Sequence, residues 1–277
     1  MADPTNEVHL PPAAVLDAFG VRDVAVPLAG GEGRSVRAGS FVFKPVGRAE
    51  TEEVEWAAGL FECLVGQAGF RVPRPLRATD GRCVVDGWAA AELVAGETGL
   101  QGRWASALTT SRAFHTALQE VPRPAFLDRR THPWAVGDRV AWGEQTVEVL
   151  PDLADPLAQL LALRRPVEPR GQIIHGDLTG NLLFAPGEEP AVIDFSPYWR
   201  PAVFAEAIII ADGLLWFDVP LDLVTGHDDP EWKQMLIRAL IFRLVAHSEA
   251  FGPAGHAASG EPQRYQNAIA AVVDGCS

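Results

Sequence analysis

Cysteine is scarce in this chain, and the few cysteines are far apart. Cys63, Cys83 and Cys276 form neither a C-x-x-C pair nor a cluster with histidine, which argues against a zinc site. So few cysteines are typical of a protein that works in a reducing compartment, and we therefore expect a cytoplasmic location. The acidic and polar residues 1–7 favour the same location, because a signal peptide begins with positive charge.

Positive charge and long hydrophobic runs are also lacking. The 36 acidic residues outnumber the 23 basic ones, so the formal net charge is −13. We therefore expect neither nucleic acid nor an anionic membrane as a partner, whereas a neutral or cationic small molecule fits better. The longest mostly apolar run, residues 202–217, is too short to span a bilayer and contains Glu206 and Asp212. It predicts a buried helix.

Lysine is almost absent. Only Lys44 and Lys233 are lysines, so arginine is used nearly everywhere that a positive charge is needed. A lysine at the end of the apolar stretch 41–43 therefore requires a specific reason. A compact ammonium group on a flexible stem suits phosphate oxygens in a narrow cleft. The alternative is an ordinary strand lysine whose stem carries its charge to water.

The composition that is present, 48% apolar and 21% charged, is that of a globular protein with an ample core. The first 95 residues predict one small antiparallel sheet, with an Asp-Gly turn at 86–87 joining its last two strands. A long helix is expected at about residues 49–65, because its apolar residues follow helical spacing. The expected strands are residues 24–28, 36–37, 41–44, 82–85 and 88–94.

A glycine-rich turn lies between the first two of these strands. Its glycines are Gly30, Gly31 and Gly33, and Ser35 follows them. Glycines permit positive φ and a close backbone approach, so backbone N–H groups could face a phosphate group. By itself such a turn is weak support, since a plain hairpin has the same composition.

The remainder, residues 96–277, has mostly helical patterns and predicts a second domain. Residues 122–151 are rich in proline and tryptophan and predict an irregular stretch. Residues 196–201, with a proline near each end, predict a rigid loop. The expected helices are residues 104–118, 153–163, 202–217, 230–251 and 262–273.

Two acids and an amide lie on short loops between apolar strands in this second part. Asp177 and Asn181 follow a strand at 173–174, and Asp194 ends a strand at 191–193 that returns from a turn at 187–190. Such a hairpin brings the three side chains together. Their oxygens suit a hard cation such as Mg²⁺, and one carboxylate could orient or deprotonate a hydroxyl group.

The motifs at this hairpin are the most specific in the chain. Residues 175–178 read H-G-D-L and residues 193–195 read I-D-F. Together with Lys44 and the glycine-rich turn, in this order, they resemble the aminoglycoside phosphotransferase and choline kinase-like family. The resemblance implies an α+β, bilobal, protein-kinase-like fold: a nucleotide-binding lobe at residues 1–95 and a helical catalytic and substrate lobe at residues 96–277.

The resemblance also implies a role for each residue in transferring phosphate from ATP or GTP to a hydroxylated small molecule. Asp177 would orient or deprotonate the attacking hydroxyl, while Asn181 and Asp194 would hold Mg²⁺. Lys44 would contact the phosphates and would be positioned by a glutamate of the long helix, with Glu55 preferred and Glu52 as the second choice. The phosphates would also meet the turn with Gly30, Gly31, Gly33 and Ser35, and the adenine edge would meet the backbone from Glu92 through Val94 to Ala95.

One departure leaves a second reading open. The family places four residues between the loop Asp and Asn, and only residues 178–180 lie between Asp177 and Asn181 here. A non-catalytic, nucleotide-binding pseudokinase would tolerate this shorter loop. A protein kinase ranks last, because the chain lacks the motifs H-R-D, D-F-G and A-P-E. The second lobe, with 14 basic and 23 acidic residues, is compatible with a cationic acceptor.

Overall fold

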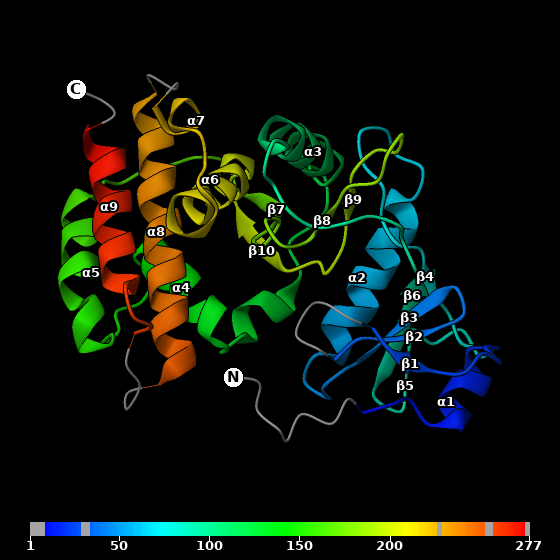
Figure 1. Cartoon of the computed structure of the whole chain (residues 1–277). Helices are drawn as coiled ribbons and strands as arrows, with labels where there is room; N and C mark the ends of the chain where they lie inside the picture. Colours follow the sequence, from blue (N-terminus) through cyan, green and yellow to red (C-terminus); the bar gives the residue numbers. More distant parts are fainter. Residues whose placement is uncertain (1–8, 29–33, 226–228, 253–256, 275–277) are drawn as a thin grey trace. The chain divides into compact units, whose positions relative to one another are not determined.

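The computed structural model describes residues 9–28, 34–225, 229–252 and 257–274 and has the α+β class that the sequence predicts (Figure 1). The chain forms two compact units, and each is described by itself. The first comprises residues 1–98 together with Leu182–Phe195, and the second comprises Gly99–Asn181 and residues 196–277. An antiparallel sheet dominates the first unit, and helices dominate the second.

The sheet of the first unit is antiparallel throughout. Its strands run in the order β1-β2-β3-β6-β4, and β5, which lies outside this order, also pairs with β6. The Asp86-Gly87 turn joins β5 to β6, as its sequence predicts. The bounds are β1 Val26–Pro27, β2 Val36–Ala38, β3 Phe41–Pro45, β4 Pro75–Leu76, β5 Val84–Val85 and β6 Trp88–Glu92.

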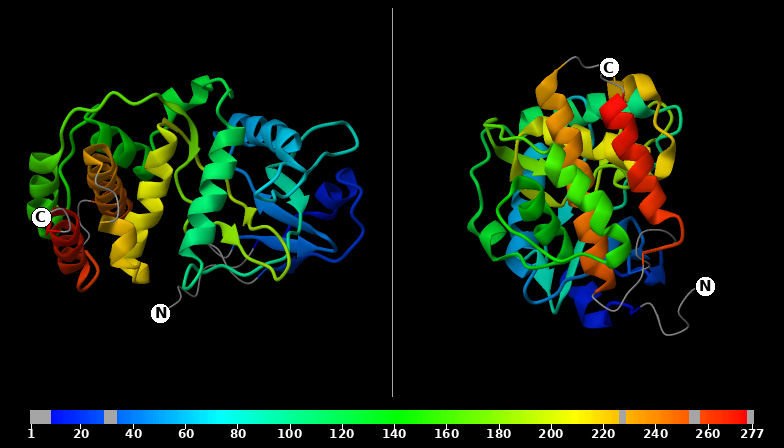
Figure 2. Two further views of the ribbon diagram at one scale, coloured as in Figure 1. Left: turned by 90° about the horizontal axis from the view of Figure 1, so that it is seen from above. Right: turned by 90° about the vertical axis from the view of Figure 1, so that its left-hand side faces the viewer.

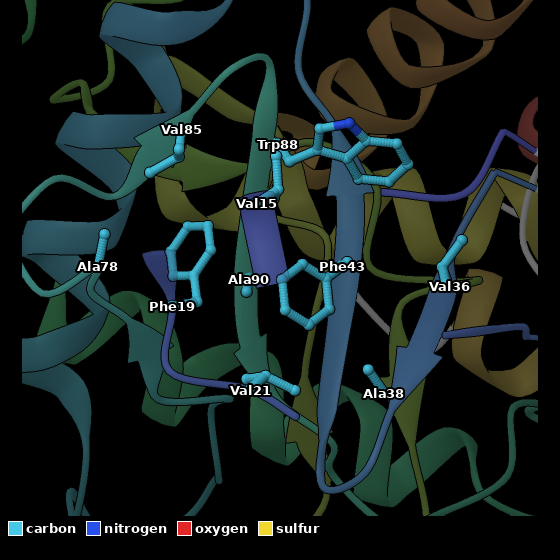
Figure 3. Packing of buried hydrophobic residues seen from close by; sticks show 10 residues of the cluster. All are labelled: Val15, Phe19, Val21, Val36, Ala38, Phe43, Ala78, Val85, Trp88 and Ala90. Atoms are coloured by element: carbon cyan, nitrogen blue, oxygen red, sulfur yellow. The ribbon is translucent and has the colours of Figure 1, made fainter. Parts of the chain in front are cut away.

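One face of this sheet packs against the short helix α1 (Ala13–Ala18) and the residues that follow it (Figure 3). Phe19 meets Phe43 of β3 edge to face, with ring centroids 5.6 Å apart. Successive side chains of a strand point to opposite faces. Because Phe43 is fully buried in this core, its neighbour Lys44 projects from the other face of the sheet.

The first unit also contains the helix α2 (Thr51–Leu64) and a hairpin distant in sequence. The hairpin strands β8 (Leu182–Leu183) and β9 (Ala191–Val192) pair with each other. Phe184 bridges to Glu97, and Ala191 bridges to Arg71. These backbone contacts attach residues 182–195 to the first unit, whereas the sequence analysis assigned them to the second lobe.

The second unit is built around α8 (Pro230–Phe251), which is buried over most of its length. It lies between α9 (Glu261–Asp274) and α6 (Ala202–Asp212), and it also packs on α4 and α5 (Figures 1 and 2). No helix in the described ranges is long and apolar enough to cross a membrane. The other helices are α3 Trp104–Ala117, α4 Pro133–Trp142, α5 Pro151–Leu163 and α7 Leu221–Thr225.

Three stretches of the second unit differ from their predicted structure. The stretch 122–151 is not irregular throughout, because α4 begins at a proline after the capping residue His132 and ends at Gly143, whose φ is +79°. The predicted loop 196–201 contains the strand β10 (Pro197–Arg200), which pairs with β7 (Gln172–His175). The predicted helix 202–217 is α6 followed by one π-helical turn at Gly213–Phe217.

Candidate active site

The first unit brings together two of the predicted site residues. The Nζ atom of Lys44, on β3, forms an ion pair with Oδ1 of Asp194, which follows β9. Both side chains remain accessible, with 41% and 42% of their surfaces exposed. The backbone of Asp194 has a φ of +51°, in the left-handed region that aspartate adopts more readily than most residues with a side chain. Lys44 therefore lies against an acid rather than in free solvent.

The residue after Asp194 is fixed against α2. Phe195 stacks on Trp56 with ring centroids 6.2 Å apart, and it meets Phe61 at 5.6 Å. An α-helix turns by about 100° per residue. Glu53 therefore lies about 60° from Trp56 on the face that contacts Phe195, between the two aromatic side chains.

The predicted partner of Lys44 is not on this face. Glu55 lies about 100° from Trp56 on the opposite side of the helix. It is exposed and lies near Arg77, whose pKa is raised by its hydrogen bond to Glu62 and further by Glu55. Lys44 thus pairs with Asp194, and among the described residues Glu55 forms no hydrogen bond or ion pair with Lys44. The choice of Glu55 rested on its place at the edge of the apolar stripe.

The predicted nucleotide-binding backbone is only partly within the described residues. Gly30, Gly31 and Gly33 lie outside them, while the carbonyl of Ser35 accepts a hydrogen bond from the Leu28 N–H at 2.9 Å. The Glu92 N–H donates to the Arg74 carbonyl at 2.9 Å. Within the described part of the chain, the backbone N–H and C=O of Val94 have no hydrogen-bond partner, so they can serve a ligand.

The second unit places the other two predicted residues on one loop. The Asn181 side-chain N–H group donates to the Asp177 carbonyl at 2.7 Å and to Asp177 Oδ2 at 3.1 Å. Nδ1 of His175 accepts a hydrogen bond from the Asp177 backbone N–H at 3.1 Å. The loop between Asp177 and Asn181 thus closes despite having three residues, and His175 serves here as an acceptor that holds it.

A buried histidine anchors the strand before this loop. His115 of α3 accepts the His175 backbone N–H on Nε2 at 3.0 Å, and its Nδ1 lies 2.7 Å from the Ser111 carbonyl. These contacts assign the proton to Nδ1, because a carbonyl only accepts. Burial, opposed by the Ser111 carbonyl and reinforced by the nearby His175, lowers the pKa of His115 to about 3. His115 is therefore neutral at physiological pH.

Comparison with known proteins identifies the family. Residues 29–198, more than half of the chain, match the model of the phosphotransferase enzyme family, and this range contains Lys44, Asp177, Asn181 and Asp194. The chain belongs to this family. The predicted resemblance is therefore confirmed. No curated protein matches the sequence of this phosphotransferase.

Solved structures show the same fold at low sequence identity. A spectinomycin phosphotransferase in complex with ADP and spectinomycin has a TM-score of 0.60 at 13% identity, over 95% of this chain and 96% of that chain. An aminoglycoside phosphotransferase from Alicyclobacillus acidocaldarius has a TM-score of 0.60 at 16% identity, over 99% and 96%. An amicoumacin kinase in complex with AMP-PNP, Ca²⁺ and Ami has a TM-score of 0.58 at 15% identity, over 90% of this chain and 88% of that chain. The kinase-like fold of the phosphotransferase is thereby confirmed.

The residues of the phosphotransferase that would bind a magnesium ion have the right chemistry. Because the Asn181 amide donates through Nδ2, its Oδ1 is left as an oxygen ligand, and Asp194 has Oδ2 beyond the oxygen that Lys44 contacts. Among the described residues, no group of three or more His, Cys, Asp or Glu side chains could hold a metal ion. Mg²⁺ is commonly bound by only one or two protein oxygens together with phosphate oxygens and water, so each of these oxygens is a suitable ligand.

Sequence reasoning missed two buried residues of the phosphotransferase. Arg243 of α8 donates to Asp177 Oδ1 at 2.8 Å and also to Asp212, the last residue of α6. Both lie in apolar segments, and the sequence analysis noted Asp212 only as a polar residue of a buried helix. Because a buried charge needs a partner, one charged residue inside each of two buried helices was a signal that these two residues pair. That Asp177 is their common neighbour could not be read from spacing.

Proposed function

We propose that this phosphotransferase transfers the γ-phosphate of ATP or GTP to a hydroxyl group of a small molecule. The observation that carries the proposal is the ion pair between Lys44 and Asp194, which are 150 positions apart in the chain. A lysine and an acid held together in an accessible position are the two groups that ATP and its metal ion require. Structural relatives solved with ADP or AMP-PNP support a nucleotide as the donor.

Lys44, Asp177, Asn181 and Asp194 each have a role that their contacts support. Lys44 would bind phosphate oxygens, and Asp194 and Asn181 would hold Mg²⁺, which supplies charge neutralisation when bound. Asp177 would orient the acceptor hydroxyl and accept its proton, and it lies on the same loop as Asn181. We assign the support of Lys44 to Glu53 rather than Glu55, because Glu53 lies on the helix face that contacts Phe195.

The nucleotide base would meet the backbone that follows β6. Val94 offers an N–H and a C=O that no other described residue uses, and Glu92 precedes it at the end of β6. Ser35, together with Gly30, Gly31 and Gly33, would face the phosphates. These assignments follow from the family pattern and from the accessibility of the backbone groups.

The acceptor belongs to the class of small hydroxylated compounds. The structural relatives include proteins solved with spectinomycin, hygromycin B and amicoumacin. The excess of acidic residues in the second lobe, 23 against 14 basic ones, favours a neutral or cationic compound over an anionic one. A screen should therefore contain these three antibiotics, amino alcohols such as choline, and neutral sugars.

Nucleotide binding is tested by calorimetry with ATP and GTP, with and without Mg²⁺. We expect binding that strengthens with Mg²⁺, and we expect Lys44→Met and Asp194→Asn each to weaken it by about tenfold or more. Lys233→Met is the matched control, because Lys233 is the other lysine and its Nζ contacts only the Val273 carbonyl at 3.4 Å among the described atoms. Unchanged affinity in both site variants would contradict the assignment.

Phosphate transfer is tested with the same proteins and γ-labelled ATP. Asp177→Asn should bind the nucleotide normally and should lower the transfer rate by a factor of about 10²–10⁴, the usual contribution of a general base. Nucleotide binding without transfer to any compound of the screen, in wild type and variant alike, would favour the pseudokinase instead.

A further inference from the structure

A buried ionic network lies directly behind the Asp177 loop. Nε of Arg243 donates to Asp212 Oδ1 at 2.6 Å, and its Nη2 donates to Asp212 Oδ2 at 2.6 Å. The same Nη2 donates to Asp177 Oδ1 at 2.8 Å. The hydroxyl of Thr179 donates to Asp212 Oδ2 at 2.6 Å. These four residues all belong to the second unit, and the three that are not Asp177 have no role in the function proposed above.

The side chains of this network differ in how far they are exposed to solvent. Side-chain exposure is 3% for Asp212, 7% for Arg243 and 41% for Asp177. Burial disfavours the charge on Arg243, but Asp212 and Asp177 outweigh it and raise the pKa of the guanidinium above its ordinary value. A buried charge persists only when it is paired and hydrogen-bonded. Asp212 therefore keeps Arg243 charged, and Arg243 in turn presents one N–H to the accessible acid.

Both oxygens of Asp177 are consequently held. Arg243 occupies Oδ1, and Asn181 donates to Oδ2 at 3.1 Å. Two donors on opposite oxygens fix the plane of the carboxylate, and the exposed side of the group remains available for a hydroxyl. The donor that Arg243 supplies from α8 sets this geometry more rigidly than the loop alone could, because α6 and α8 pack closely against each other.

The network also explains how the short loop keeps its shape. Thr179 lies in the middle of the three residues that separate Asp177 from Asn181, and its side chain is buried with its hydroxyl on Asp212. The hydroxyl thus ties the loop to the end of α6. The hydrogen bond from Thr179 to Asp212 therefore holds the backbone between Asp177 and Asn181 in place, although the loop is one residue shorter than in the family.

We propose that Arg243 is a positioning residue that aims Asp177 at the acceptor hydroxyl, with Asp212 and Thr179 holding Arg243 and the loop in place. This inference rests on the proposed function, in which Asp177 acts on the acceptor. A network that merely fastened α6 to α8 would affect folding but would not change the turnover of folded protein.

The test compares variants in MgATP hydrolysis by water and in transfer to whichever compound of the screen accepts phosphate. Arg243→Met should lower kcat by about 100-fold, the loss typical of a misplaced catalytic group, and should change the KM for MgATP by less than threefold. Arg243→Lys keeps the charge with a single donor group, so it should recover part of kcat. Thr179→Val, which has the same shape without the hydroxyl, should lower kcat by several fold.

A matched control removes another ion pair that reaches α6. Arg112 of α3 pairs with Glu206 at 2.7 Å, and Arg112→Met should leave kcat within twofold of wild type. In an Asp177→Asn background, Arg243→Met should lower the remaining activity by less than threefold, because the group that it positions is already lost.

Three results would overturn the positioning role in a wild type that is active. They are a kcat within threefold of wild type for folded Arg243→Met, an equal loss in the Asp177→Asn background, or an unchanged kcat in Thr179→Val. The Thr179 variant decides the question if Arg243→Met does not fold. A wild type that transfers phosphate neither to water nor to any compound would instead overturn the proposed function, and the positioning role with it.

Discussion

At the scale of single residues, Gly176 is the loop position at which a side chain would not fit. A Cβ atom at Gly176 would lie 2.4 Å from two ring carbons of Tyr198, a distance that packed atoms do not adopt. The Gly176 N–H also donates to the Ser196 carbonyl at 2.9 Å, so its backbone cannot simply move away. The H-G-D-L motif therefore needs glycine at its second position because β10 passes directly beside it.

Gly176→Ala should consequently lower the free energy of unfolding by about 1–3 kcal/mol, the usual cost of overpacking. Chemical denaturation measures this change. Gly180→Ala is the control in the same loop, since no heavy atom lies within 4 Å of its Cβ position. Its effect should stay within about 0.5 kcal/mol. Equal effects of the two substitutions would show that the Tyr198 ring is not the obstacle.

At the scale of secondary-structure elements, His115 joins α3 to the end of β7 through its two ring nitrogens. Its pKa is about 3 in the folded protein, mainly because of burial, whereas an exposed histidine of the unfolded chain has a pKa of about 6.5. Protons therefore bind the unfolded chain first as the pH falls. The stabilisation is complete above pH ~6.5 and is lost progressively towards pH ~3.

This difference predicts a loss of about 2 kcal/mol of unfolding free energy from His115 between pH 7.5 and pH 5. Urea denaturation at several pH values in this range measures it. His175, whose backbone N–H donates to Nε2 of His115, contributes to lowering the pKa of His115. The His115→Gln variant should be less stable at pH 7.5 but should show a smaller decline towards pH 5. Parallel pH profiles in the two proteins would contradict a neutral, buried His115.

The same scale shows how much of the fold the sequence predicts. Periodicity and turn residues were sufficient to predict α2, α3, α5, α8 and α9, because the residues of each helix have helical spacing of their own. The helix α4 was missed because residues 122–151 are rich in proline and tryptophan and were interpreted as irregular, although Pro133 is at the first helical position, where helices accept proline. The strand β10 was missed because its pairing partner, β7, lies more than 20 residues earlier in the chain.

At the scale of the whole molecule, the motifs identified the family, but contacts between distant segments decided the details of the site. The sequence singled out Lys44, Asp177, Asn181 and Asp194 by residue type and order. It could not show that Lys44 pairs with Asp194, since that depends on where the hairpin 182–195 packs. The contact of Arg243 with Asp177 was equally hidden, because the two residues are 66 positions apart in the chain.

The scarcity of lysine makes the nucleotide site chemically addressable in the whole protein. An amine-reactive acetylating reagent can modify only Lys44, Lys233 and the amino terminus of this chain. The Lys44 side chain is 41% exposed, so it is open to the reagent. If phosphate groups bind Lys44, saturating MgATP should slow its acetylation by at least about fivefold, because the bound phosphates then cover the side-chain nitrogen.

Peptide mass spectrometry reads each lysine separately, which gives the experiment an internal reference. Lys233 donates to the Val273 carbonyl in the second unit, and its acetylation rate should be the same with and without MgATP. In a Lys44→Arg variant, the acetylation that MgATP slows should be absent, and the acetylation of Lys233 should be unchanged. Two results would contradict the assignment, provided that MgATP binds with measurable affinity: an unchanged acetylation rate of Lys44, or an equal slowing of both lysines. Either result would mean that the nucleotide phosphates do not contact Lys44 and that the glycine-rich turn and β3 do not form their binding site.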